Sequence, residues 1–170
     1  QAAVEKAMAM GAKVITVSDS SGTIVDEDGF TPEKLAILME IKNHLYGRVS
    51  DYAERTGVRF EAGVSPWHVP VDIALPCATQ NELHIDDARV LIANGVQCVA
   101  EGANMPTTIE AAKAFEAAGV LYAPGKASNA GGVATSGLEM SQNAARMSWP
   151  REEVDARLLQ IMQGIHAACK

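Results

Sequence analysis

The feature that most constrains the fold is an alternation of short apolar segments with longer stretches of helical periodicity. Four short segments are rich in apolar and β-branched residues: residues 14–17, 71–75, 97–100 and 120–123. Three stretches between them have the apolar spacing and capping residues of helices: residues 31–45, 81–93 and 108–118. This order predicts an α/β fold, with a doubly wound, mostly parallel sheet and helices on both of its faces.

The two ends of the chain depart from this alternation. A helical pattern stops at Gly11, and no initiator Met or capping residue precedes Gln1. The last third of the chain reads as two helices with no strand after them: residues 133–145 and 151–168. We therefore expect one domain, residues 1–170, that is incomplete at both ends.

Composition argues against several classes of partner. The formal net charge is −7 and no segment is rich in Lys or Arg, which argues against nucleic acid and against an anionic membrane surface. No apolar stretch approaches the ~18 residues of a membrane helix. The three cysteines are widely spaced and the histidines lack metal-ligand spacing, so we expect a cytoplasmic protein with a small-molecule ligand and no metal.

Polar loops follow each of the four expected strands. In open α/β sheets, ligands bind outside the carboxyl ends of the strands, so these loops are expected to meet at one crevice. The alternative is that they are ordinary turns. The loops are residues 18–22, 76–81, 101–106 and 124–132.

Asp19 closes the first of these strands. In dinucleotide-binding units, an acidic residue at the end of the corresponding strand meets the adenosine ribose, and such a residue is typical of NAD. Ser20 and Ser21 add hydroxyl donors, and Lys42 and Arg48 are able to bring positive charge to a 2′-phosphate. From spacing alone, however, the two basic residues are better explained as part of a solvated surface.

Several other polar residues have two interpretations. Asn81 is either a helix N-cap, with Glu82 in the first turn, or a ligand contact. Asn104 and Asn129 lie in loops where an amide can bond a carboxamide, with turn formation as the alternative. Ser136, expected near a helix start, suits a carboxylate or is simply a small packing residue.

Read together, the loops resemble the NADP-specific glutamate dehydrogenases of bacterial type. The motifs are SDSSG at residues 18–22, LPCATQNE at 75–82, EGANMPT at 101–107 and NAGGVATSGLE at 129–139. The resemblance covers essentially the whole chain and implies a Rossmann-like dinucleotide-binding domain, residues 1–170. It further implies reversible oxidative deamination of L-glutamate to 2-oxoglutarate and ammonium with NADP, in a homo-oligomer that is a hexamer.

The resemblance also implies residue roles. It places four residues around the adenosine 2′-phosphate, with Ser21 beside them: Asp19, Ser20, Lys42 and Arg48. It places four others along the ribose and nicotinamide: Ala78, Gln80, Asn104 and Asn129. Ser136 resembles the serine that binds the substrate side-chain carboxylate, where leucine and phenylalanine dehydrogenases carry an apolar residue.

The family's catalytic Lys and Asp and its glycine-rich phosphate loop are expected before Gln1. We therefore expect no catalytic residue in this chain and no activity from it alone. Two other interpretations remain open. One is an NAD-linked amino-acid dehydrogenase of the same superfamily, favoured by Asp19; the other is a catalytically silent binding or oligomerisation domain.

Overall fold

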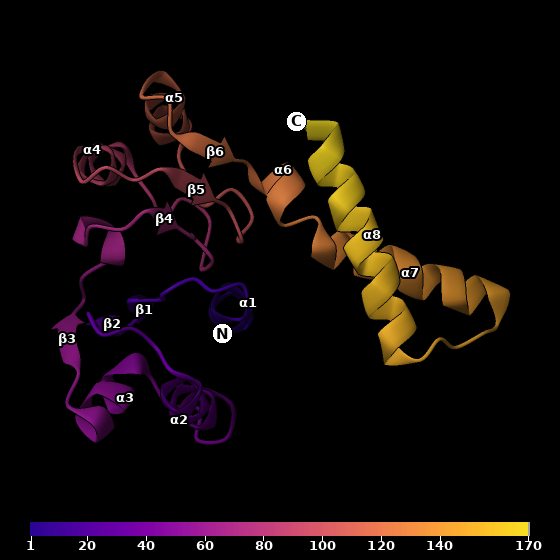
Figure 1. Ribbon diagram of the computed structural model, residues 1–170, viewed down its shortest axis with the longest axis horizontal. Helices are drawn as coiled ribbons and strands as arrows, with labels where there is room; N and C mark the ends of the chain where they lie inside the picture. The colour runs from indigo at the N-terminus through magenta and orange to yellow at the C-terminus, as the bar shows by residue number, and fades with distance from the viewer. Residues whose placement is uncertain (170) are drawn as a thin grey trace. The chain divides into compact units, whose positions relative to one another are not determined.

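The computed structural model describes residues 1–169. The chain divides into two compact units, the first made of residues 1–71 and 86–96, the second of residues 72–85 and the chain from residue 97 onward (Figure 1). Each unit contains one three-stranded sheet. No helix within residues 1–169 is both long and apolar enough to cross a membrane.

The first unit is built around an antiparallel sheet of order β1-β2-β3. Its elements are α1 (Ala2–Ala9), β1 (Thr16–Asp19), β2 (Gly22–Val25), α2 (Pro32–Asn43), α3 (Val49–Thr56), β3 (Arg59–Ala62), the 3-10 helix η1 (Pro66–His68) and most of α4 (Ile85–Ala93). The predicted helix end at Gly11 and the predicted N-cap at Thr31 are both confirmed, since Gly11 has φ 88° and the Thr31 side chain accepts from the Lys34 N–H.

The expectation of a parallel strand over residues 14–17 is wrong. Strand β1 begins at Thr16, continues through Asp19 and pairs in antiparallel fashion with β2 across a tight turn. Polar residues at 18–22 read as the loop that ends a strand, whereas they form the tip of a hairpin. Gly22 makes the turn possible, because its φ is 145° and a Cβ there would collide with the Glu61 carbonyl oxygen.

The core of the first unit lies between β2 and the helices α2 and α3. Ile24, Leu38 and Tyr52 are at most 1% exposed, and the rings of Phe30 and Tyr52 stack with centroids 5.8 Å apart. Fully burying side chains of this size contributes about 1.5–3 kcal/mol each relative to leaving them exposed. This packing fixes α2 and α3 beside the hairpin tip.

The second unit contains the predicted parallel sheet, of order β4-β5-β6. Its elements are β4 (Ile73–Ala74), β5 (Cys98–Ala100), α5 (Ile109–Ala117), β6 (Leu121–Ala123), α6 (Gly125–Ser128), α7 (Gly131–Ala145) and α8 (Arg151–Cys169). Val99 of β5 and Phe115 of α5 are fully buried, so α5 packs on this sheet. The strand and helix order expected from residue 97 onward is confirmed, with α6 as an addition.

The helices α7 and α8 form a hairpin at the end of the described chain (Figure 1). Arg146 ends the first helix in a left-handed conformation, and the Arg157 guanidinium lies 4.1 Å from the centre of the Trp149 ring. The Trp149 backbone N–H donates to the Gln142 side chain at 2.6 Å. These contacts close the turn between the two helices.

Candidate functional site

Asp19, at the hairpin tip in the first unit, accepts hydrogen bonds on both carboxylate oxygens. Oδ1 receives the Ser21 backbone N–H at 2.8 Å and the Ser21 hydroxyl at 2.7 Å. Oδ2 receives the Lys42 ammonium at 2.7 Å and the Val49 N–H, at the start of α3, at 3.1 Å. The carboxylate therefore joins β1, α2 and α3 through four donors.

The pKa of Asp19 reflects these contacts. Partial burial raises the pKa, but hydrogen bonds from Lys42, Ser21 and Val49 outweigh burial and lower it from 3.8 to about 2. The Asp19 and Lys42 side chains are 15% and 25% exposed, so solvent screens this ion pair little. Asp19 is consequently ionised at neutral pH.

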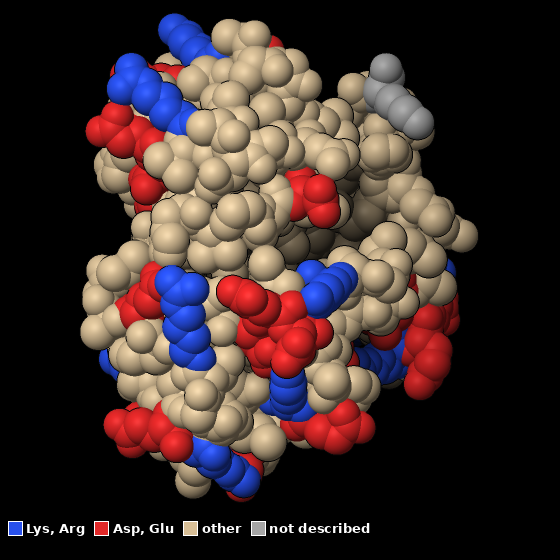
Figure 2. Space-filling view, turned by 60° about the vertical axis from the view of Figure 1, so that its left-hand side comes forward, with Lys and Arg blue, Asp and Glu red and all other residues tan. Residues whose placement is uncertain are grey.

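The predicted adenosine-end residues come together around this carboxylate. The Arg48 guanidinium donates to the Ser20 hydroxyl at 2.5 Å, and the Arg48 N–H donates to Asp51 at 2.8 Å, which orients the residue before α3. The surface interpretation of Lys42 is wrong in one respect, because its ammonium is paired with Asp19 rather than free in solvent. On the face drawn in Figure 2, Lys and Arg side chains lie among Asp and Glu side chains.

Three of the four predicted loops meet in the second unit. The Pro76 carbonyl oxygen accepts from the Gly102 N–H at 2.9 Å and the Ala103 N–H at 3.1 Å. A Cβ at position 102 would lie 2.5 Å from the Cys77 sulfur, so the loops approach closely at that point. The fourth predicted loop, residues 18–22, belongs to the first unit.

The first of these three loops corrects the interpretation of Asn81 as a helix N-cap. Helix α4 begins at Ile85, and Asn81 has φ 55° with its N–H donating to the Met105 carbonyl at 3.0 Å. Asn81 therefore joins two loops in a left-handed conformation that Asn tolerates well. Ala78 and Gln80, both predicted to line the cofactor, are exposed.

Glu82 shapes the same loop. Its carboxylate accepts from the Ala78 N–H at 2.7 Å. Burial raises the pKa of Glu82, while bonds from the Ala78 and Thr79 N–H groups lower it. The pKa of the neighbouring Cys77 thiol is raised by partial burial and then by Glu82, which disfavours the thiolate.

Asn104 and Asn129 lie on the adjoining loops. Asn104 is exposed, in the loop after β5. The Asn129 side-chain NH2 group donates to the Ala103 carbonyl at 2.7 Å, which fixes the plane of this amide. The interpretation of Asn129 as a turn residue alone is incomplete, because its side chain ties α6 to the loop after β5.

Ser136 lies within α7 rather than at its first turn. The helix begins at Gly131, and the Ser136 hydroxyl donates to the Gly132 carbonyl oxygen at 3.3 Å. Ser136 is exposed, so its interpretation as a helix-packing residue is not supported in the described structure. Its hydroxyl is accessible to a solute.

Sequence reasoning missed the most buried acidic side chain of the second unit, Glu101. It is 4% exposed and bonds the Tyr122 hydroxyl and the Gly125 N–H. Burial, followed by Glu101 itself, raises the pKa of Tyr122, so the hydroxyl stays protonated at neutral pH. A lone Glu at a strand end gives no local signal, because both partners lie more than 20 residues away.

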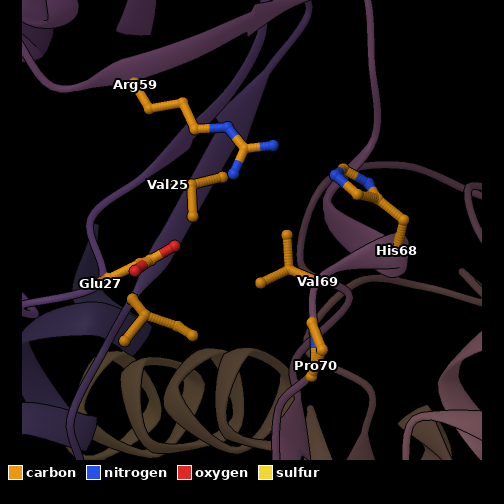
Figure 3. A pocket seen from close by; sticks show the side chains of 7 residues that line it. Val25, Glu27, Arg59, His68, Val69 and Pro70 are labelled. Carbon is orange, nitrogen blue, oxygen red and sulfur yellow. The ribbon is translucent and has the colours of Figure 1, made fainter.

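A separate hollow of about 370 Å³ lies in the first unit (Figure 3). Val25 and Val69 line it together with Glu27, Arg59 and His68. Glu61 pairs with the Arg59 guanidinium at 2.5 Å and with the His68 Nε2 atom at 2.8 Å. None of the predicted site residues lines this hollow.

The described side chains form no metal-binding cluster. Within residues 1–169, no group of three or more His, Cys, Asp and Glu side chains is arranged to hold a metal ion. What the two sites offer instead is cations and hydroxyls beside Asp19 in the first unit, and amides and backbone groups in the second. These groups suit hydrogen bonding to phosphate, ribose and carboxamide.

Comparison with known proteins gives consistent results. The chain is 72% identical to the NADP-specific glutamate dehydrogenase of Salmonella typhimurium and 69% identical to that of Escherichia coli, each over 169 residues. Both alignments cover 99% of this chain and 38% of the relative, so the chain spans about two-fifths of the length of these relatives.

Solved structures agree with the sequence relatives. The crystal structure of Plasmodium falciparum glutamate dehydrogenase matches 98% of this chain and 36% of its own, at 44% identity and a TM-score of 0.92. The family model for Glutamate/Leucine/Phenylalanine/Valine dehydrogenase matches residues 1–170. The chain therefore belongs to the glutamate/leucine/phenylalanine/valine dehydrogenase family.

Proposed function

We propose that this chain is the C-terminal dinucleotide-binding domain of an NADP-dependent glutamate dehydrogenase. The reaction is the reversible conversion of L-glutamate, NADP⁺ and water to 2-oxoglutarate, ammonium, NADPH and a proton. The identity to relatives named NADP-specific glutamate dehydrogenase supports this proposal. So does the parallel order β4-β5-β6, which is typical of a Rossmann-like, doubly wound domain.

The observation that carries the choice of NADP is the state of Asp19. An acidic residue that selects NAD must accept hydrogen bonds from the ribose hydroxyls. Here both carboxylate oxygens already accept from donors of the chain. The Ser20 hydroxyl, the Arg48 guanidinium and the Lys42 ammonium lie together at the hairpin tip, and this set of donors suits a 2′-phosphate.

The other cofactor contacts follow from the loops of the second unit. Ala78, Gln80 and Asn104 are exposed on loops that bond one another, as a ribose-binding wall requires. The Asn129 amide, fixed by Ala103, has an oxygen that suits the NH2 group of a nicotinamide carboxamide. When bound, the cofactor accepts or gives a hydride at the substrate α-carbon, and these residues orient it.

Ser136 is proposed to donate its hydroxyl to the side-chain carboxylate of glutamate. An apolar residue here would leave that carboxylate without this donor, which distinguishes glutamate from leucine or phenylalanine as substrate. In the bound state the hydroxyl would turn from the Gly132 carbonyl to the substrate. The bond to Gly132, at 3.3 Å, is long enough to be exchanged at small cost.

A second candidate is an NAD-linked amino-acid dehydrogenase of the same superfamily. A relative from Xylanibacter ruminicola, 57% identical to this chain, is named NAD(P)-specific glutamate dehydrogenase. This candidate is not favoured, because Asp19 is engaged by Lys42, Ser21 and Val49. We further propose a homo-oligomeric, hexameric, cytoplasmic enzyme; the acidic net charge and the three free cysteines are in keeping with the cytoplasm.

The test is a spectrophotometric assay of the full-length protein with 2-oxoglutarate and ammonium. We expect NADPH oxidation to exceed NADH oxidation, and no turnover from residues 1–170 alone. Oxidation of NADPH by the isolated chain, or a requirement for an apolar 2-oxo acid in place of 2-oxoglutarate, would refute the assignment. Size-exclusion chromatography with light scattering measures the oligomeric state independently.

A further inference from the structure

Glu101, at the end of β5, joins three segments of the second unit. One carboxylate oxygen accepts from the Tyr122 hydroxyl of β6 at 2.6 Å, and the other accepts from the Gly125 N–H at the start of α6 at 2.5 Å. The main-chain oxygen of Glu101 accepts from the Ser128 hydroxyl at 2.6 Å. Both ends of the short helix α6 are therefore held by one residue.

Burying the Glu101 carboxylate has an unfavourable free energy that stability alone does not explain. Glu101 is 4% exposed, and a buried carboxylate loses most of its hydration. Apolar side chains that fill the same volume often stabilise a protein as well as a buried charge does. The hydrogen bonds of Glu101 are directional, so they instead specify one placement of α6 relative to the loop that follows β5.

The placement of α6 determines where the Asn129 amide lies. A Cβ on Gly125 would lie 2.9 Å from the Asn129 Nδ2 atom and 3.1 Å from both the Ala103 carbonyl oxygen and the Glu101 Oε2 atom. The Asn129 Nδ2 atom donates to that same Ala103 oxygen at 2.7 Å. The Glu101 carboxylate and the Asn129 amide thus both lie close to Gly125, where even a Cβ would crowd them.

We propose that Glu101 is a positioning residue, which holds α6 against the loop after β5 so that Asn129 presents its amide to the nicotinamide end of the cofactor. Glu101 acts through Gly125 and Asn129 and does not itself touch the cofactor. The inference rests on the proposed function, because it assigns the Asn129 amide to a nicotinamide carboxamide. It adds a residue that neither the motifs nor the relatives' names assign.

Two substitutions separate position from charge. Glu101→Gln keeps an oxygen for the Gly125 N–H and places an NH2 group toward Tyr122. The Tyr122 hydroxyl then turns its proton to the side chain of Thr107, a buried neighbour that already interacts with it. Glu101→Ala removes both acceptors and frees α6. Val99→Ala, a fully buried change two residues earlier on β5, is the matched control for lost stability.

The experiment measures the Kd of each variant of the full-length protein for NADPH and for 2′,5′-ADP, a probe of the adenosine end. For Glu101→Ala we expect NADPH binding weakened about tenfold, as for loss of one well-placed hydrogen bond, with 2′,5′-ADP binding unchanged. Glu101→Gln should stay within about threefold of the wild type. The primary isotope effect on kcat with 4-deuterated NADPH should rise only in Glu101→Ala, because a misplaced nicotinamide slows hydride transfer.

Other outcomes would overturn the inference. If the Glu101→Ala variant has the same affinities for NADPH and 2′,5′-ADP as the Val99→Ala variant, the role of Glu101 is purely structural. If the Glu101→Gln variant binds NADPH as weakly as the Glu101→Ala variant, the charge of Glu101 matters rather than its position. Where Glu101→Ala fails to fold, Tyr122→Phe takes its place, with a smaller loss in the same direction expected and no loss contradicting the inference. Wild-type protein that binds neither NADPH nor 2′,5′-ADP would instead refute the proposed function.

Discussion

Replacing Asp19 with Asn tests whether the charged carboxylate at the hairpin tip stabilises the fold, because the change keeps the size of the side chain and removes its charge. The pKa of Asp19 is about 2 against an ordinary value of 3.8. One pKa unit corresponds to about 1.4 kcal/mol, so ionised Asp19 contributes about 2 kcal/mol to the free energy of unfolding at pH 7. The Asn variant should lose this amount.

The pH dependence gives the prediction its sign. The pKa is lower in the folded state, so the stabilisation is fully present above pH 3.8 and is lost as the pH falls toward 2. The difference between wild type and variant should therefore shrink from about 2 kcal/mol at pH 7 to about 1 kcal/mol at pH 3. Urea denaturation at several pH values measures it.

A matched control is available in the same unit. Glu40 pairs with Arg55 at 2.7 Å, but both side chains are 48% exposed. Glu40→Gln should change the free energy of unfolding by less than about 0.5 kcal/mol at any pH. The account of Asp19 would be refuted if Asp19→Asn lowered the free energy of unfolding no more than this control does. It would also be refuted if that loss of stability were the same at pH 7 and at pH 3.

Four further changes test other parts of the account. Ser136→Val should lower kcat/KM for glutamate about 10- to 100-fold without weakening NADPH binding, as measured by steady-state kinetics and fluorescence titration; unchanged glutamate kinetics would remove Ser136 from the site. Gly22→Ala should destabilise the hairpin by more than ~1 kcal/mol, because φ 145° is unfavourable for Ala and the new Cβ meets a backbone oxygen. Phe115→Ala should lower the free energy of unfolding by about 3–5 kcal/mol through the cavity it leaves in a fully buried site. Thr31→Ala should cost about 1 kcal/mol through loss of the N-cap of α2, visible in the same denaturation curves.

The sequence predicted the helices and strands that are marked by capping residues or by short apolar runs. The Thr31 and Pro32 pair marked the start of α2, and the short apolar runs after residue 70 marked the parallel strands. The hairpin was missed because Ser20 and Ser21 read as a loop that ends a strand, and its second strand, β2, also pairs with β3, some 40 residues later. Helix α3 was missed although its buried residues Val49, Tyr52 and Ala53 have helical spacing.

The candidate site shows the same division. The Ser20, Lys42 and Arg48 cluster was found through family resemblance, since spacing alone favoured a surface interpretation of the two cations. Glu101 escaped both approaches, because its partners come from other segments and a single Glu carries no pattern. One of the two interpretations of Asn81 was the cap of a helix, but that helix starts at Ile85. In a sequence, an Asn that caps a helix looks the same as an Asn in a turn with positive φ.

The most direct test of the central claim is a fluorescence titration of NADPH and of NADH against the full-length protein and its Lys42→Gln and Arg48→Gln variants. We expect the wild type to bind NADPH at least tenfold more tightly than NADH, since a 2′-phosphate gains charge-assisted hydrogen bonds. Each variant should lose much of that preference while keeping its affinity for NADH. Tighter binding of NADH than of NADPH by the wild type, or variants that keep the full preference for NADPH, would contradict the assignment of Ser20, Lys42 and Arg48 to the 2′-phosphate.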